Sequence, residues 1–265
     1  AVCTYNPEGN QSILVADSEG FRRDDALLDS LSAYTEEGVR WMPQWRQVVE
    51  NCLRFFDQQA LYESKGIAWR RGVLLHGSPG NGKTYAVKTL VSLVRKPVVY
   101  VRSFRSTDSL EMDQIRNVFR RARTIAPCLV ILEDLDCLIG EEALSYFLNE
   151  LDGLNSNHGL LTVATTNQME RIDPALTERP SRFDRKIEFG LPDASVRRRF
   201  LEHRGYQVSD LLVQDTEGFS IAFLAEWAIS YELARIEDPL IAPEELQREV
   251  AQRLRTQLAG SPESG

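Results

Sequence analysis

The stretch that decides the fold is Gly77-Ser78-Pro79-Gly80-Asn81-Gly82-Lys83-Thr84. It follows a short apolar run at residues 73–76, which predicts a buried strand, and it precedes a segment with helical periodicity. A glycine-rich loop that ends in Lys-Thr between a strand and a helix has the G-x-x-x-x-G-K-[ST] pattern of a phosphate-binding loop. Its glycines let backbone N–H groups surround phosphate oxygens, and the helix N-terminus adds positive charge. The sequence therefore predicts a nucleotide site in a P-loop fold.

The residues of this loop have separate expected roles. Lys83 is expected to reach the outer phosphates of ATP, and Thr84 Oγ1 is expected to ligate Mg²⁺. The alternative is an ordinary Gly-Pro turn, but a turn alone does not explain why strand, loop and helix follow in this order. The predicted nucleotide-binding residues are Gly77, Ser78, Pro79, Gly80, Asn81, Gly82, Lys83, Thr84 and Tyr85.

Apolar runs alternate with helix-period segments, which predicts a parallel sheet covered by helices on both faces, a three-layer α/β domain. Five runs are expected to form the parallel strands: residues 73–76, 98–101, 129–132, 160–165 and 186–189. Two segments between them have apolar residues at i, i+3, i+4 and i+7, which predicts amphipathic helices. Their apolar positions are Ile115, Val118, Phe119 and Ala122 in one, and Leu144, Phe147, Leu148 and Leu151 in the other.

The strand pattern ends near Asp193, so we predict a domain boundary there. Helical stretches follow at residues 196–203, 220–236 and 243–258. We expect an N-terminal extension over residues 1–36, the nucleotide-binding domain over 37–192, and a small helical lid domain over 193–265. Within the extension, residues 12–16 are a candidate edge strand and 24–31 a candidate helix, and residues 260–265 are expected to fray.

An acidic element follows the third predicted strand and reads Glu133-Asp134-Leu135-Asp136. Mg²⁺ and the attacking water both need carboxylates beside the phosphates. By position, Glu133 is expected to hold the Mg²⁺ shell and Asp134 to orient the water. An acidic cluster after an apolar run is usually a solvated loop, but together with the phosphate loop it is the expected second half of the site.

From about Trp69 to Ala222 the chain resembles the AAA family of ATPases. Besides the loop and the acidic element, the resemblance rests on Ala164-Thr165-Thr166-Asn167, Ile172-Asp173-Pro174-Ala175-Leu176 and Arg179-Pro180-Ser181-Arg182-Phe183-Asp184-Arg185. It implies that Asn167 helps to position the lytic water and that Arg179 and Arg182 reach the ATP of a neighbouring subunit. It also implies a homo-oligomeric ring, usually a hexamer, that hydrolyses ATP to remodel a protein or complex.

The chain departs from the family pattern in three places. Most relatives carry Asp before Glu, whereas Glu133 precedes Asp134 here; a mitochondrial AAA translocase has the same order, which implies that hydrolysis can survive the exchange. Residues 103–109 lack the aromatic, apolar and Gly triplet of threading members, and we expect Phe104 to be a core or loop anchor rather than a pore contact. The start of the lid helix lacks the usual Gly-Ala-Asp. More narrowly, the chain resembles a little-described AAA subgroup of fungal and bacterial proteins with an inverted Glu-Asp pair.

Two other functions stay open. The inverted acidic pair is compatible with an ATP-binding switch or scaffold that turns over little. The second alternative is a DNA-directed AAA protein of the clamp-loader or initiator type, but no helix-turn-helix segment is recognisable. Arginines cluster at residues 116–123 and 197–199 without interleaved aromatic residues, so we expect solvated faces or subunit contacts and no nucleic-acid partner.

Composition sets the remaining bounds. The 265 residues are 43% hydrophobic, enough to bury a substantial core, and a net charge of -8 argues against nucleic-acid binding through the surface as a whole. Cys3, Cys52, Cys128 and Cys137 are scattered, without the spacing of a zinc site or a disulfide framework. No run of 18 apolar residues predicts a membrane segment. We expect a soluble, cytoplasmic protein; the chain begins with Ala1, so a fragment of a longer protein is one interpretation.

Overall fold

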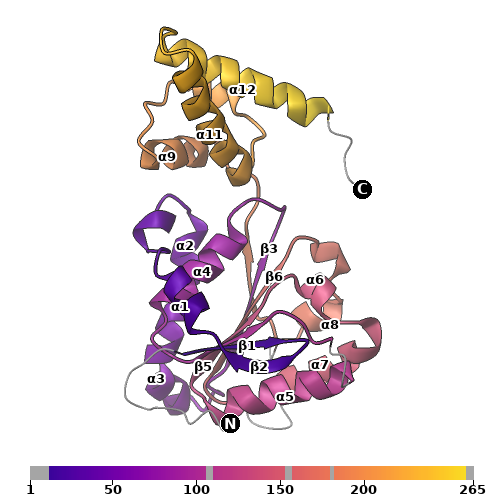
Figure 1. Cartoon of the computed structure of the whole chain (residues 1–265). Coiled ribbons are helices and arrows are strands. Elements are labelled where there is room, and N and C mark those ends of the chain that lie inside the picture. The colour runs from indigo at the N-terminus through magenta and orange to yellow at the C-terminus, as the bar shows by residue number, and fades with distance from the viewer. Residues whose placement is uncertain (1–11, 106–109, 153–156, 180–181, 261–265) are drawn as a thin grey trace. The chain divides into compact units, whose positions relative to one another are not determined.

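The computed structural model describes residues 12–105, 110–152, 157–179 and 182–260 (Figure 1). The chain divides into two compact units. The first comprises Ala1–Arg40, Gln44–Gly77 and Lys83–Glu188, and the second comprises Trp41–Pro43, Ser78–Gly82 and Phe189–Gly265. The sequence predictions for Cys3, for residues 106–109, for Pro180 and Ser181, and for the tail at 261–265 lie outside the described residues.

A mostly parallel sheet forms the centre of the first unit. Its strands are β1 (Ile13–Asp17), β2 (Gly20–Arg23), β3 (Arg71–His76), β4 (Val98–Val101), β5 (Cys128–Leu132), β6 (Leu160–Thr166) and β7 (Arg185–Glu188). Their order is β2-β1-β4-β5-β6-β3-β7. The strand before the phosphate loop, β3, lies between β6 and β7, so the carboxyl ends of β3 and β6 meet at one edge of the sheet.

The α/β prediction is confirmed, but the sheet has seven strands rather than five. The five predicted strands are β3 to β7. The added pair is a hairpin: β1 pairs antiparallel with β2 and parallel with β4, placing Ile13 beside Val98. The sequence predicted an edge strand at residues 12–16. Strand β1 forms there, but the strand at the edge of the sheet is β2. Strand β2 reads Gly-Phe-Arg-Arg and is largely exposed, so it lacks the alternation that makes a strand recognisable.

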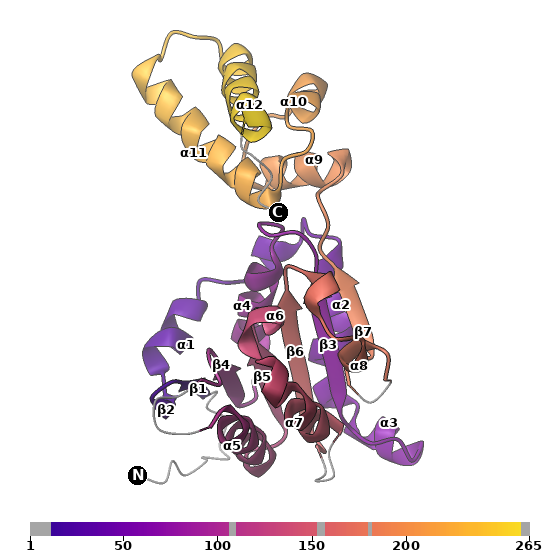
Figure 2. The same cartoon turned by 90° about the vertical axis from the view of Figure 1, so that its right-hand side faces the viewer.

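Helices cover both faces of this sheet, with α1 and α4 on one side and α5 and α7 on the other (Figures 1 and 2). The helices of this unit are α1 (Asp25–Leu31), α2 (Gln44–Val48), α3 (Gln59–Ser64), α4 (Lys83–Leu93), α5 (Glu111–Thr124), α6 (Leu135–Leu138), α7 (Glu141–Asp152) and α8 (Pro174–Thr177). Short 3-10 or π turns lie at Glu37–Val39, Val49–Leu53, Arg54–Asp57 and Met169–Arg171.

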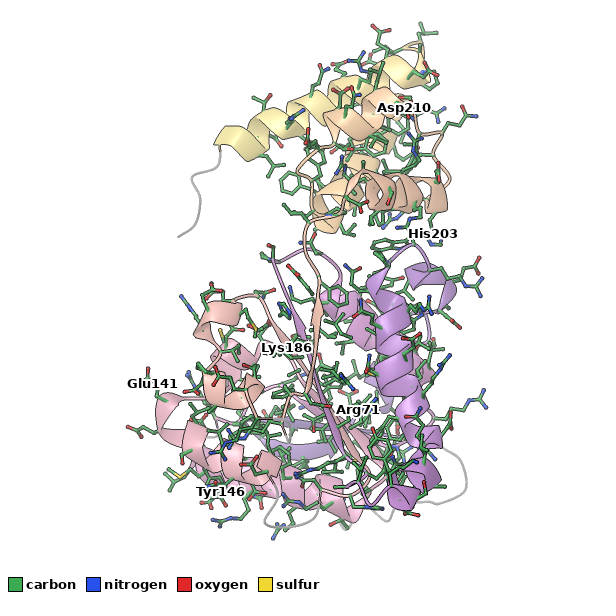
Figure 3. All side chains as sticks on the ribbon, turned by 180° about the vertical axis from the view of Figure 1, so that it is seen from behind. Arg71, Glu141, Tyr146, Lys186, His203 and Asp210 are labelled. Carbon is green, nitrogen blue, oxygen red and sulfur yellow. The ribbon has the colours of Figure 1, made fainter. Side chains whose placement is uncertain are left out.

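The amphipathic helices pack as predicted. In α5 the four apolar positions are all buried, and in α7 Phe147 and Leu151 are buried while Leu144 and Leu148 are partly buried. Phe104 is also fully buried and its ring lies 6.0 Å from that of Phe147, so the core role expected for it is confirmed. Side chains fill the space on both sides of the sheet, and the labels of Arg71 and Lys186 mark neighbouring strands β3 and β7 (Figure 3).

The second unit is helical, with α9 (Ala194–His203), α10 (Asp210–Asp215), α11 (Ile221–Glu237) and α12 (Pro243–Gly260). His203 and Asp210 mark the turn from α9 to α10 in Figure 3. The sequence predicted the three longer helices, whereas the six residues of α10 are too few to give a periodic signal. Trp227 anchors the unit: it is fully buried and donates a hydrogen bond to the Gln247 carbonyl at 3.1 Å. None of the helices in the described residues is long and apolar enough to span a bilayer.

Candidate functional site

The phosphate loop has the backbone conformation that its glycines predicted. Gly77, Gly80 and Gly82 have φ values of 129°, 76° and 95°, which residues with a Cβ rarely adopt. Space is also short at Gly82, where an added Cβ would lie 2.7 Å from Met42 Cε. Helix α4 begins at Lys83, so the loop runs directly into a helix N-terminus. This is the local structure that presents backbone N–H groups to an anion.

Within the second unit, residues 78–82 pack against the start of α11. The Asn81 side chain is buried; its Nδ2 donates to the Ser78 carbonyl at 3.2 Å, and its Oδ1 accepts from the Ile221 N–H at 3.4 Å. The Ala222 N–H donates to the Gly80 carbonyl at 2.8 Å. Asn81 therefore has a structural role in this loop that the motif alone did not reveal.

Lys83 and the acidic residues lie in the first unit. The Lys83 side chain is mostly buried, and its Nζ donates to the Gly77 carbonyl at 2.5 Å. Burial lowers the pKa of the ammonium group, and the Asp134 and Asp136 carboxylates oppose that shift. The ammonium is thus held at the first residue of the phosphate loop, on the side of the acidic element. Tyr85, by contrast, packs its ring 5.0 Å from that of Tyr34.

Glu133 follows β5 and lies beside two hydroxyl groups. Its Oε2 accepts a hydrogen bond from the Tyr100 phenol, and the Thr84 hydroxyl lies close enough to lower the pKa of the carboxyl. The pKa of the Glu133 carboxyl is raised, chiefly by burial, although both hydroxyl groups oppose the shift. Burial, followed by the charge of Glu133, raises the pKa of Tyr100, which keeps the phenol protonated as a donor. The structure thus places Thr84 beside the acidic element.

The oxygen donors here fit a magnesium ion. Glu133 Oε1 is buried and has no hydrogen-bond partner in the described residues, a costly arrangement for a carboxylate oxygen. The Thr84 hydroxyl lies against the same carboxylate. Mg²⁺ prefers hard oxygen ligands and usually keeps several of its waters, so a few protein oxygens are enough to hold it beside phosphates. Thr84 and Glu133 are the residues that would hold it.

Asp134 is hydrogen-bonded to residues at the carboxyl end of β6. Its backbone is left-handed, with φ 50°, a conformation that Asp tolerates better than most residues. Its N–H donates to Thr165 Oγ1 at 3.0 Å, and its Oδ1 accepts from Asn167 Nδ2 at 3.2 Å. Asp134 and Asn167 are both exposed. The structure therefore brings together the two residues that the sequence linked to the attacking water.

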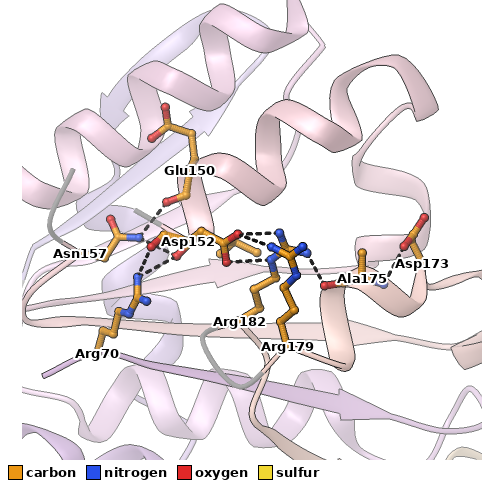
Figure 4. Close-up of polar contacts among 9 residues, drawn as sticks. Arg70, Glu150, Asp152, Asn157, Asp173, Ala175, Arg179 and Arg182 are labelled. Carbon is orange, nitrogen blue, oxygen red and sulfur yellow. Dashed lines mark hydrogen bonds and ion pairs between the residues drawn. The ribbon is translucent and has the colours of Figure 1, made fainter. Parts of the chain in front are cut away.

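The two arginines occupy very different environments (Figure 4). The Arg182 side chain is only 4% exposed and forms a bidentate pair with Asp152, from Nε at 2.9 Å and from Nη2 at 2.6 Å. Its Nη1 also donates to the Ala175 carbonyl. Arg179 is 66% exposed, and its Nη1 lies 3.4 Å from Asp152 Oδ2. Arg182 is thus fixed inside its own chain, while Arg179 extends into solvent beside it.

The backbone at Arg182 is fixed by a close approach to β3. A Cβ added at Gly72 would lie 1.9 Å from the Arg182 carbonyl oxygen. Gly72→Ala should therefore destabilise the protein by about 1 to 3 kcal/mol, the usual range for overpacking, when measured by urea unfolding. Gly140→Ala is the matched control, because its added Cβ meets the flexible Glu111 carboxylate at 3.0 Å. Equal stability of both variants would contradict the close packing of Arg182.

Two residues of this region were not among those predicted. Tyr100 was missed because its contact with Glu133 depends on which strands are neighbours; the pairing of β4 with β5 places it beside Ile131. Asp152 was missed because it is 30 residues from Arg182 and ends a helix whose pattern signalled only packing. Neither residue belongs to a recognisable motif, but knowledge of the strand order would have predicted that Tyr100 lies near Glu133.

A phosphate loop that follows β3 and precedes a helix, with carboxylates after β5 on the other side of β6, defines a P-loop nucleotide-binding domain. The family of ATPases associated with various cellular activities (AAA) matches residues 73–191. The chain is 29% identical to the ATP-dependent zinc metalloprotease FtsH of Mycoplasmopsis pulmonis over 243 residues, 83% of this chain and 31% of the relative. It is 31% identical to FtsH 3 of Phytoplasma mali over 217 residues, 73% of this chain and 36% of the relative.

Residues 73–191 form an AAA-type ATPase domain of the P-loop NTPase superfamily. The sequence prediction of an AAA-type, ATP-hydrolysing enzyme is confirmed at the level of the family. The chain spans about a third of the length of the curated relatives named above. The narrower resemblance to a subgroup with an inverted acidic pair stays a prediction.

Proposed function

We propose that this chain binds Mg-ATP and hydrolyses it by in-line attack of water on the γ-phosphate. The observation that carries the proposal is the hydrogen bond from Asn167 to Asp134, together with the place of Thr84 beside Glu133. One contact brings the phosphate loop beside the acidic element, and the other joins that element to Asn167, directly after β6. Together they assemble the residues that P-loop ATP hydrolysis requires.

In this proposal each side chain has one task. Lys83 neutralises charge on the outer phosphates, and the backbone of residues 77–84 binds their oxygens. Thr84 and Glu133 hold Mg²⁺, which when bound adds positive charge at the phosphate oxygens. Asp134, oriented by Asn167, accepts a hydrogen bond from the attacking water and aligns it. Because Asp134 is exposed, water reaches it directly.

We further propose that hydrolysis drives the remodelling of a protein substrate in a homo-oligomeric ring. The relatives support this, because they are named ATP-dependent metalloproteases, which joins ATP dependence to proteolysis. The exposure of Arg179 supports it independently, since an arginine in solvent is available to a neighbouring subunit. An intracellular location fits the thiols of Cys52, Cys128 and Cys137, which are all free. Hexamer size and the identity of the substrate are expectations from the family resemblance.

The direct test is steady-state phosphate release from ATP with and without Mg²⁺. The wild-type chain should turn over only with Mg²⁺, whereas Lys83→Ala should lose turnover and bind Mg-ATP at least about tenfold more weakly, because the charge on the outer phosphates is lost. Lys186→Ala, an exposed lysine on β7, is the control. Tight ATP binding by wild type without phosphate release would favour the switch or scaffold. Unchanged ATP affinity of Lys83→Ala in calorimetry would contradict the assigned site.

A further inference from the structure

Tyr100 lies beside the acidic element without belonging to any motif of the nucleotide site. It occupies the third position of the four-residue strand β4, and its backbone is held on one side by β5 and on the other by β1. Parallel pairing sets Tyr100 opposite Ile131, two residues before Glu133. The side chain is half-buried and its phenol donates to Glu133 Oε2. A strand in the middle of the sheet therefore fixes a hydroxyl donor against the first carboxylate.

The two oxygens of Glu133 differ as a result. Oε2 is bound by the phenol, whereas Oε1 is buried and has no hydrogen-bond partner in the described part of the chain. A buried carboxylate oxygen without a partner is costly unless a cation or an ordered water meets it. The phenol therefore determines which oxygen of Glu133 is left for a ligand.

We propose that Tyr100 is a positioning residue for magnesium: by binding Glu133 Oε2, it aims Oε1 at the Mg²⁺ that accompanies ATP. The inference rests on the function proposed above. It also gives a physical reason why Glu can ligate Mg²⁺ at position 133, where the family pattern has Asp. Glu has one more rotatable bond than Asp, and that freedom must be removed for precise ligation. The phenol removes it by a hydrogen bond to a charged group, which is stronger than one between neutral groups.

The alternative is that Tyr100 only lines a pocket and has no effect on Glu133. It lines a pocket of about 420 Å³ together with Arg102, Ser103, Arg105 and Cys137, besides the two acidic residues. In that case the ring matters for packing and the hydroxyl does not. Tyr100→Phe separates the two roles, because it keeps the ring and removes only the hydroxyl.

The experiment compares Tyr100→Phe with Tyr146→Phe. Tyr146 lies on α7, outside the acidic element, and its phenol oxygen accepts a hydrogen bond from Arg116 on α5. Two quantities are measured: the Mg²⁺ concentration for half-maximal phosphate release, and Mn²⁺ affinity of the ADP complex by electron paramagnetic resonance. Tyr100→Phe should raise the Mg²⁺ requirement and weaken Mn²⁺ binding, each about tenfold, as expected for a lost hydrogen bond to a charged group. The turnover number at saturating Mg²⁺ should change much less. Tyr146→Phe should match wild type.

A second background makes the test specific to the contact. In Glu133→Asp the shorter side chain no longer reaches the phenol, so adding Tyr100→Phe should have no further effect on Mn²⁺ affinity. An equal loss in both backgrounds, or wild-type Mn²⁺ affinity of Tyr100→Phe with an unchanged melting temperature, would overturn the proposal. If the wild-type chain releases no phosphate, the proposed function is wrong, while the Mn²⁺ titration of the ADP complex still decides the role of Tyr100.

Discussion

Replacement of Asp134 by Asn should lower the turnover number about 10²- to 10⁴-fold, the usual contribution of a positioned acid–base group. Affinity for Mg-ATP should stay within a few-fold of wild type. The reason is that Asp134 contacts Asn167, whereas Glu133 is the carboxylate beside the Thr84 hydroxyl. An amide keeps the shape of the side chain but removes the negative charge that aligns the water. Single-turnover phosphate release, measured beside equilibrium binding of Mg-ATP, separates chemistry from affinity.

The matched comparison is Glu133→Gln, which changes the neighbouring carboxylate in the same way. It should chiefly raise the Mg²⁺ concentration needed for half-maximal activity, because it weakens a magnesium ligand. The reverse result, normal turnover in Asp134→Asn and tight but unproductive ATP binding in Glu133→Gln, would assign the water to Glu133. That outcome would mean that the residue types, rather than their positions along the strand end, fix the two roles.

The sequence predicted the parts of this fold that depend on local pattern. Strands β3 to β6 are short apolar runs, and their burial on both faces follows from helices covering the sheet on either side. The phosphate loop was recognisable because glycine spacing is set by backbone geometry within eight consecutive residues. The hairpin strand β2 was missed because its arginines face solvent, so its sequence resembles a loop.

Contacts between residues far apart in the chain could not be predicted from the sequence. The burial of Arg182 depends on its ion pair with Asp152 at the end of α7. Arg70 holds the same helix end, because its Nη1 donates to the carbonyls of residues 151 and 152 (Figure 4). A motif shows that Arg179 and Arg182 are three residues apart, but not that one is buried and the other exposed. That difference changes which arginine we expect to act on a neighbouring subunit.

Arg179→Ala should lower turnover about 10³- to 10⁵-fold, the value of an arginine supplied in trans, or about 4 to 7 kcal/mol of barrier. It should leave the free energy of unfolding nearly unchanged, because an exposed ion pair contributes only about 0 to 1 kcal/mol. Arg182→Ala should instead destabilise the fold by about 3 to 5 kcal/mol, since it leaves Asp152 without its buried partner. Arg46→Ala, with a side chain 86% exposed, is the control for loss of a surface arginine. Urea unfolding and phosphate release distinguish these outcomes.

Mixing subunits tests whether Arg179 acts across an interface. Arg179→Ala chains keep an intact phosphate loop, and Lys83→Ala chains keep an intact Arg179, so each variant alone should be nearly inactive. Mixed assemblies should recover activity wherever an intact loop faces an intact arginine. Light scattering establishes that mixed assemblies form. Silence of such assemblies, or full activity of Arg179→Ala by itself, would exclude a trans arginine at this position and remove the structural support for a ring, because the exposure of Arg179 would then have no role in hydrolysis.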